Sequence, residues 1–165
     1  MSPTLLADSH CHINFPDFAP DFGSVLERAA NNGVAYLLCV SVDLENFQQI
    51  RTLTLNHQNI FCSIGVHPNT VCPQKGEPEI AELVEIGRDP AVVAIGETGL
   101  DYFRSTGDLE WQKERFRVHI RAAKLAGLPV IVHTRNARND TINVLKDEGA
   151  GKCGGVMHCF TEDWE

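Results

Sequence analysis

The chain has 165 residues, 43% of them apolar and 22% charged, which is enough for one globular domain with a hydrophobic core. Its net charge of −8 is unfavourable for a protein that grips nucleic acid through a basic surface, but it does not exclude a nucleic-acid substrate, because bound divalent cations change the local field. Residues 1–8 lack the basic and apolar parts of a secretory signal, and the longest near-apolar run, residues 34–42, is too short to cross a membrane. We therefore expect a cytoplasmic protein with no membrane contact and no obligate protein partner.

Strand-like and helix-like segments alternate along the whole chain. Apolar, β-branched runs predict strands at residues 4–12, 34–42, 59–67, 90–97, 128–134 and 154–160. Amphipathic segments predict helices at residues 21–32, 44–57, 78–88, 108–126 and 137–148, and Thr161 is a candidate cap of a sixth helix over residues 161–165. This alternation is typical of a parallel sheet covered by helices.

Two α/β folds fit this order: an open doubly wound sheet and a (β/α) barrel of the TIM type. The first predicted strand is followed by HCHIN instead of the glycine-rich turn of a dinucleotide-binding fold, which disfavours the doubly wound alternative. A complete barrel has eight β/α units and about 250 residues. We therefore predict a single domain over residues 1–165 that forms about six of the eight units of a TIM-type barrel.

The six cysteines show no C-x-x-C spacing; they are Cys11, Cys39, Cys62, Cys72, Cys153 and Cys159. Without a secretory signal, this scatter predicts reduced and mostly buried thiols, and it argues against a zinc–thiolate site.

Residues 8–14 read DSHCHIN, at the end of the first predicted strand. Successive side chains of a strand point to opposite faces, so Asp8, His10 and His12 share one face, and Cys11 points to the other, where we expect it to pack. Two imidazoles on one face fit a metal site. Taken alone, they fit a pair of buried structural histidines equally well.

The carboxyl ends of later strands carry the same kind of side chain: His67 after the third, Glu97 after the fourth, His133 after the fifth and His158 after the sixth. Active sites of parallel α/β folds are built at this edge, so the repeated pattern favours metal binding over packing. A single catalytic metal needs three protein ligands and an open position, and this set is larger. The surplus predicts two metal ions bridged by Glu97, a centre that activates water for hydrolysis.

Other polar residues are less specific. His57 and His119 lie in predicted helices and are interpreted as surface or packing residues. Asp101 and Tyr102 lie in the predicted loop after the fourth strand, where a solvated or capping role competes with substrate contact. Arg135 either binds an anionic group of the substrate or forms a surface salt bridge.

In this order and spacing, the segments DSHCH, SIGVHPN, AIGETGLDY, GLPVIVHTR and GGVMHCFTED resemble the TatD family of metal-dependent deoxyribonucleases, which are TIM-barrel hydrolases of the amidohydrolase-like group. The resemblance covers the whole chain. It implies that His10 and His12 bind one metal, that His133 and His158 bind the other, and that the catalytic Glu97 bridges the two.

The resemblance also implies that His67 contacts substrate phosphate, and that the substrate is DNA, cleaved at its phosphodiester bonds and often from the 3′ end. The expected cofactors are two divalent metal ions. Magnesium follows from the resemblance, and zinc, manganese or iron are alternatives, because they suit imidazole-rich sites.

Three features depart from the family pattern. Asn14 and Asn136 stand where many members carry an acidic residue, which affects fine positioning and not the ligand set. The chain ends at Glu165, before the seventh and eighth strands and the aspartate ligand that the family carries near the end of the eighth. We therefore expect the first and sixth strands to be sheet edges, and this polypeptide, taken alone, to be a weak or inactive hydrolase.

Two further functions stay open. An amide or ester hydrolase can use the same scaffold, but such relatives often bridge their metals with a modified lysine at the fourth strand, where AVVAIGETGL offers Glu97 and no lysine. The other alternative is a non-catalytic, truncated fragment or isoform that binds metal, or binds a partner through its exposed edges.

Overall fold

The computed structural model describes residues 5–71 and 76–161, so Cys72 and most of the predicted sixth helix lie outside the described residues. The strands are β1 (Leu6–Cys11), β2 (Val34–Cys39), β3 (Ile60–Ile64), β4 (Val92–Asp101), β5 (Val130–Arg135) and β6 (Gly155–Met157). The helices are α1 (Phe22–Asn31), α2 (Phe47–Asn56), α3 (Ile80–Ile86), α4 (Glu110–Ala126) and α5 (Arg138–Asp147), with short 3₁₀ turns at Pro16–Asp21 and Ala150–Lys152.

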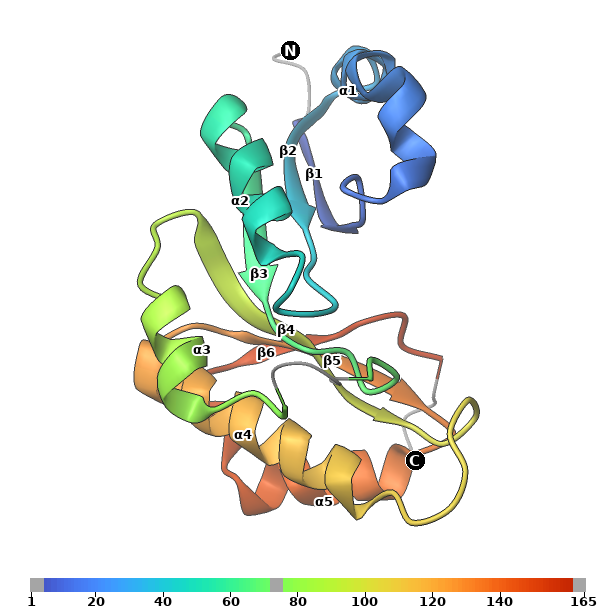
Figure 1. Ribbon diagram of the computed structural model, residues 1–165, viewed down its shortest axis with the longest axis vertical. Helices are drawn as coiled ribbons and strands as arrows, with labels where there is room; N and C mark the ends of the chain where they lie inside the picture. Colours follow the sequence, from blue (N-terminus) through green and yellow to red (C-terminus); the bar gives the residue numbers. More distant parts are fainter. Residues whose placement is uncertain (1–4, 72–75, 162–165) are drawn as a thin grey trace.

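The six strands form one parallel sheet in the order β1-β2-β3-β4-β5-β6, and the sheet curls into an open half-barrel (Figure 1). A doubly wound sheet reverses its strand order at a switch point, and this sheet does not. The prediction of an incomplete TIM-type barrel is therefore confirmed. As expected, β1 and β6 are the two edges among the described strands.

The helices cover the outer side of the half-barrel, and α4 lies between α3 and α5 in this layer (Figure 1). It packs against β4 and against both neighbouring helices, α3 and α5 (Figure 1). Phe116 and Ile120 of α4 are completely buried, and they join Ile95 and Leu100 of β4 in the main hydrophobic core. No helix in the described ranges is long and apolar enough to cross a membrane.

The fourth strand is longer than predicted and continues to Asp101. The prediction that Asp101 lies in a loop is therefore wrong. Two glycines make the extension possible, because a Cβ atom at Gly96 would lie 2.6 Å from the Ile131 carbonyl oxygen, and one at Gly99 would lie 2.0 Å from that of His133. Because Gly96 and Gly99 have no side chains, β4 can approach β5 closely, and it pairs with β5 as far as Asp101, the last residue of β4.

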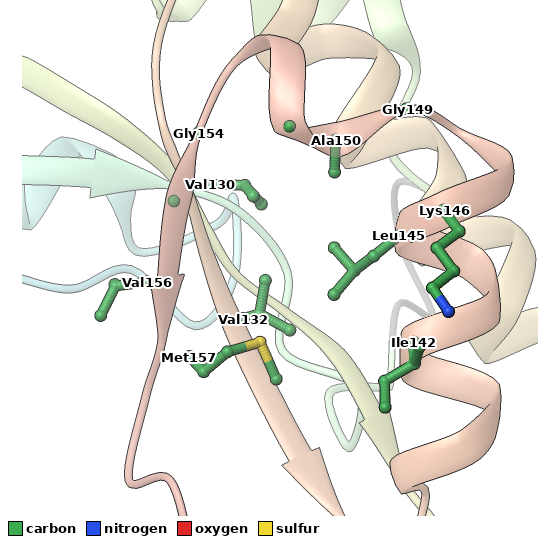
Figure 2. A pocket seen from close by; sticks show the side chains of 12 residues that line it. Val130, Val132, Ile142, Leu145, Lys146, Gly149, Ala150, Gly154, Val156 and Met157 are labelled. Carbon is green, nitrogen blue, oxygen red and sulfur yellow. The ribbon is translucent and has the colours of Figure 1, made fainter. Parts of the chain in front are cut away.

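An apolar groove of about 430 Å³ lies between α5 and the edge strand β6 (Figure 2). Its lining includes Val130 and Val132 of β5, Ile142 and Leu145 of α5, and Met157 of β6. No histidine is among the described residues that line this groove.

Candidate metal centre

The residues predicted from the strand ends gather at one edge of the sheet. His10 lies in β1, Glu97 in β4 and His133 in β5, whereas His12, His67 and His158 follow β1, β3 and β6 in the chain. An open cavity of about 410 Å³ is lined by His12, His67, Glu97, His133 and His158, together with Phe15, Asn69 and Arg104. Because parallel strands end at the same edge, residues up to 148 positions apart in the sequence meet here.

Glu97 occupies an irregular point of β4. The register with β5 shifts between Ile95 and Thr98, where β4 contains one residue more than the strand beside it. Such a bulge redirects a side chain relative to the regular pleat. The Glu97 side chain is 5% exposed and lies between histidines on both sides.

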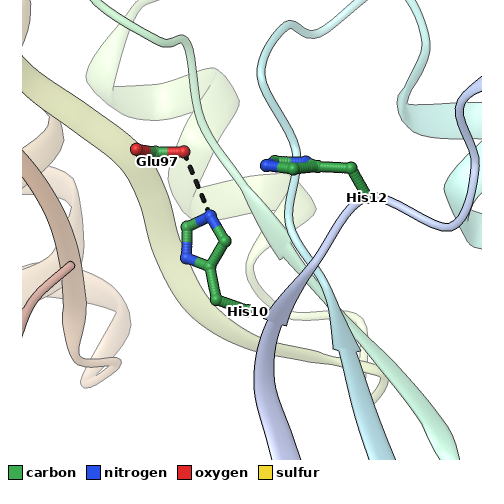
Figure 3. A group of neighbouring side chains, drawn as sticks. All are labelled: His10, His12 and Glu97. Carbon is green, nitrogen blue, oxygen red and sulfur yellow. Dashed lines mark ion pairs between the residues drawn. The ribbon is translucent and has the colours of Figure 1, made fainter. Parts of the chain in front are cut away.

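One group of candidate ligands consists of His10, His12 and Glu97 (Figure 3), whose ligand atoms lie within 4.8 Å of one another. His10 Nε2 lies 3.3 Å from Glu97 Oε2, yet within the described residues this buried nitrogen has no hydrogen-bond partner. His12 Nδ1 lies 3.0 Å from the Val40 carbonyl oxygen, which can only accept a hydrogen bond. The proton of neutral His12 is therefore on Nδ1, and Nε2 keeps the lone pair that a metal needs.

The second group consists of His67, Glu97 and His133. His133 Nδ1 lies 3.1 Å from Glu97 Oε1 and 3.3 Å from His67 Nε2. The backbone N–H of Asn69 donates to His67 Nδ1 at 3.1 Å. Neutral His67 therefore carries its proton on Nε2, which makes it a hydrogen-bond donor toward the cavity and a poor ligand through that atom.

Burial favours the uncharged form of His12, His67 and His158. It lowers the pKa of His67 to about 4, against an opposing effect of Glu97, and it also lowers the pKa of His12 and His158. Burial opposes ionisation of Glu97, but the imidazoles of His10, His133 and His67 around the carboxylate outweigh it and hold the pKa of this carboxyl well below its usual range. An ionised carboxylate among neutral imidazoles is the donor set of a divalent metal site.

His158 and Arg135 lie outside the two groups of candidate ligands around Glu97. The His158 ring stacks on that of His10, with ring centroids 3.5 Å apart, and does not join either group around Glu97. Arg135 lies with its guanidinium 4.2 Å from the centre of the Phe103 ring and is not among the described residues that line the cavity. Asn14, the departure after the HxH unit, accepts a hydrogen bond from the Cys39 thiol.

Asp101 and Asn69 lie beside the predicted ligands, although neither was predicted to contact them. Asp101 is fully buried, and its Oδ2 lies 3.2 Å from His133 Nε2. Asn69 donates to the same oxygen at 2.7 Å. The GLDY segment signalled Asp101, but only the extended β4 places it beside His133.

The predicted packing role of His119 and the prediction for the cysteines agree with the structure. His119 is completely buried, and its Nε2 accepts the backbone N–H of Val66, just before His67. Of the described cysteines, Cys39 and Cys62 are buried, Cys11 and Cys153 are partly buried, Cys159 is exposed, and all five are free thiols.

Known proteins resemble this chain in sequence and in fold. The family model described as TatD related DNase matches residues 7–165. The uncharacterized metal-dependent hydrolase YcfH of Escherichia coli is 40% identical over 97% of this chain, and the human protein named deoxyribonuclease TATDN3 is 34% identical over 94%. The chain spans about 60% of the length of these curated relatives.

Solved structures agree with the sequence comparison. The crystal structure of YJJV, a TatD homologue from Escherichia coli, superposes with a TM-score of 0.85 at 32% identity, over 96% of this chain and 61% of that one. A TatD family hydrolase from Entamoeba histolytica superposes with a TM-score of 0.83 at 29% identity, over 96% of this chain and 59% of that one.

Proposed function

The chain belongs to the TatD family. We propose that it forms part of a divalent-metal-dependent hydrolase that cleaves DNA phosphodiester bonds. The observation that carries this proposal is the position of Glu97, whose two oxygens face different histidines, Oε2 facing His10 and Oε1 facing His133. One carboxylate that faces imidazoles on both sides is suited to hold two ions a short distance apart. We propose His10, His12, His133 and His158 as the further ligands.

Two bound divalent ions would supply an activated water and positive charge for the attacking and leaving oxygens of the phosphodiester. In the reaction, the water oxygen forms a bond to phosphorus and gives up a proton, the bond from phosphorus to the leaving nucleoside oxygen breaks, and that oxygen takes up a proton to become a hydroxyl group. The name of the family favours DNA as the substrate, and the human relative is also named a deoxyribonuclease. We propose magnesium or manganese as the working ion and the cytoplasm as the location.

The chain's own residues have separate roles in this proposal. Glu97 stays ionised and holds the centre together, since its pKa lies well below its usual range. His67 carries its N–H on Nε2, which faces His133 Nδ1, and this N–H can donate to a non-bridging phosphate oxygen once a metal ion binds at His133. Arg104 lines the same cavity and offers positive charge that the net charge of −8 does not suggest.

The test measures nucleotide release from 3′-labelled single-stranded and duplex DNA with Mg²⁺, with Mn²⁺, and with EDTA. We expect cleavage that EDTA abolishes and that Glu97→Ala reduces by at least a hundredfold. Glu82→Ala, an exposed glutamate of α3, is the matched control and should cleave like the parent. Cleavage that survives in EDTA, or no difference between the parent and Glu97→Ala, would overturn the proposal.

A further inference from the structure

The Asp101 carboxylate, which the proposed function does not use, is held by four hydrogen bonds. Its Oδ1 accepts the backbone N–H groups of Phe103 and Arg104, at 3.0 and 2.8 Å. Its Oδ2 accepts the Asn69 amide at 2.7 Å and faces His133 Nε2 at 3.2 Å. A buried carboxylate with so many donors has a single orientation.

The orientation of Asn69 is itself determined by neighbouring groups. Buried Gln112 accepts the Asp101 backbone N–H through Oε1, so its amide nitrogen points the other way and donates to Ser105 Oγ at 2.8 Å. Ser105 Oγ can then donate to Asn69 Oδ1, at 3.1 Å. Each donor in this series of hydrogen bonds meets an acceptor, and the Asn69 NH₂ group is thereby left facing Asp101.

Both ring nitrogens of His133 face a carboxylate oxygen, Nε2 facing Asp101 at 3.2 Å and Nδ1 facing Glu97 at 3.1 Å, so the carboxylates alone do not decide which nitrogen is protonated. The decision comes from His67, whose Nε2–H points at His133 Nδ1 from 3.3 Å: two N–H groups cannot face each other, so neutral His133 carries its proton on Nε2, toward Asp101. Neutral His133 then has its lone pair on Nδ1, the atom that faces Glu97 and His67. His67 Nε2–H, fixed by Asn69 on the other side of its ring, is a matching donor for this lone pair. The hydrogen bonds therefore agree in direction from Asn69 through His67 and His133 to Asp101.

We propose that Asp101 is a positioning residue that holds His133 in the Nε2–H tautomer and so makes Nδ1 its metal-binding atom. The proposal rests on the proposed metal-dependent function, because it assigns one ligand atom of that centre. Carboxylates that accept the second ring N–H of a metal-binding histidine commonly set its orientation, and their loss lowers metal affinity about 10–100-fold.

The informative variant is Asp101→Asn, which keeps the side-chain shape. Its amide oxygen is needed by two backbone N–H groups at the Oδ1 position, so its NH₂ group is left facing both His133 Nε2 and the Asn69 side chain, whose amide must turn over to accept from it. His133 Nε2 must then accept a hydrogen bond from this NH₂ group. The ring proton of His133 therefore moves to Nδ1, where it blocks the metal-binding position. Asp140→Asn is the matched control, because Asp140 accepts from the Tyr102 hydroxyl and pairs with Lys113 outside the cavity.

Two measurements test the proposal without DNA. Two-bond ¹H–¹⁵N correlation spectra of the metal-free protein at about pH 8, above the ordinary histidine pKa, report the tautomer of His133. Titration calorimetry with Mn²⁺ reports metal affinity. We expect the Nε2–H tautomer in the parent and in Asp140→Asn, and the Nδ1–H tautomer with about 10–100-fold weaker Mn²⁺ binding in Asp101→Asn.

The Nδ1–H tautomer in the parent protein would overturn the proposal without any variant, and so would unchanged Mn²⁺ affinity in a folded Asp101→Asn protein. These outcomes are separate from those of the DNA assay. The expected tautomers and affinities without DNA cleavage would leave the proposal intact and remove the proposed substrate, whereas cleavage with an Nδ1–H His133 would do the reverse.

Discussion

The imidazole of His10 stacks on that of His158, with ring centroids 3.5 Å apart and ring planes 11° apart. His10 belongs to β1 and His158 directly follows β6, the two edge strands of the sheet. The contact therefore joins the carboxyl ends of the first and last strands, although neither strand pairs with the other. Curling of the sheet around this point brings the histidines of distant strands into one cavity.

His67 and His158 should differ in their effects on metal binding. His67 carries a proton on the nitrogen that faces the cavity, so His67→Ala should leave Mn²⁺ affinity within about twofold and weaken DNA binding instead. His158→Ala should weaken Mn²⁺ binding at one site by at least about tenfold, as expected for loss of a ligand or its support. Calorimetric stoichiometry checks this prediction, and loss of a bound ion in His67→Ala would show that His67 is a ligand.

His119 should make stability depend on pH. Burial lowers the pKa of His119 to about 4, below the ordinary value of 6.5, so the folded state binds fewer protons than the unfolded state between these values. Its contribution is complete above about pH 6.5 and is lost as the pH falls toward 4, with a size of up to about 3 kcal/mol.

Urea unfolding between pH 7 and 4 measures this effect. The free energy of unfolding should fall less steeply with pH in His119→Gln, whose amide oxygen can still accept the Val66 N–H. Parallel slopes for the two proteins would mean that His119 does not contribute.

Gly99 should be intolerant of any side chain. Its φ is 137°, and a Cβ atom would lie 2.0 Å from the His133 carbonyl oxygen, so Gly99→Ala must push β4 away from β5. We expect a loss of at least about 2 kcal/mol of stability and a loss of Mn²⁺ binding, because His133 moves with β5.

Gly107→Ala is the matched control for this prediction. Gly107 also has a positive φ, of 87°, but a Cβ atom there would meet no atom within 4 Å. In urea unfolding, the free energy of unfolding of Gly107→Ala should fall by only about 1 kcal/mol, the conformational cost of a side chain at positive φ, and metal binding should be unchanged. Equal losses in both variants would refute the role of close strand approach.

Arg115 should hold the loop that carries His67. Its guanidinium donates to the carbonyl oxygens of His67 and Thr70 and forms a paired contact with Glu77, and its side chain is 2% exposed. Lysine lacks the planar fork, so Arg115→Lys should cost about 1–3 kcal/mol and speed amide hydrogen exchange at residues 66–70.

Arg117 of the same helix provides the control, because it pairs only with glutamates of α4 in the described structure. Arg117→Lys should change stability by less than about 0.5 kcal/mol and leave exchange in the loop unaltered. Unchanged exchange in Arg115→Lys would contradict the tethering role.

The sequence by itself determined the alternation of strands and helices and the position of the candidate ligands at strand ends. The strong apolar runs and the glycine stops made the elements visible, and parallel strands necessarily bring their carboxyl ends to one edge. This reasoning reached His10, His12, Glu97 and His133 without coordinates, because each lies within or directly beside a strand.

Only the tertiary structure decided how these side chains meet. The extension of β4 to Asp101 depends on close backbone contact at Gly96 and Gly99, which no local pattern of apolar residues records. The stacking of His158 on His10 depends on the curvature of the whole sheet. The proton positions of His67 and His133 depend on hydrogen bonds to Asn69 and Asp101, because a ring tautomer is set by whichever partner lies beside it in space and not by neighbours in the chain.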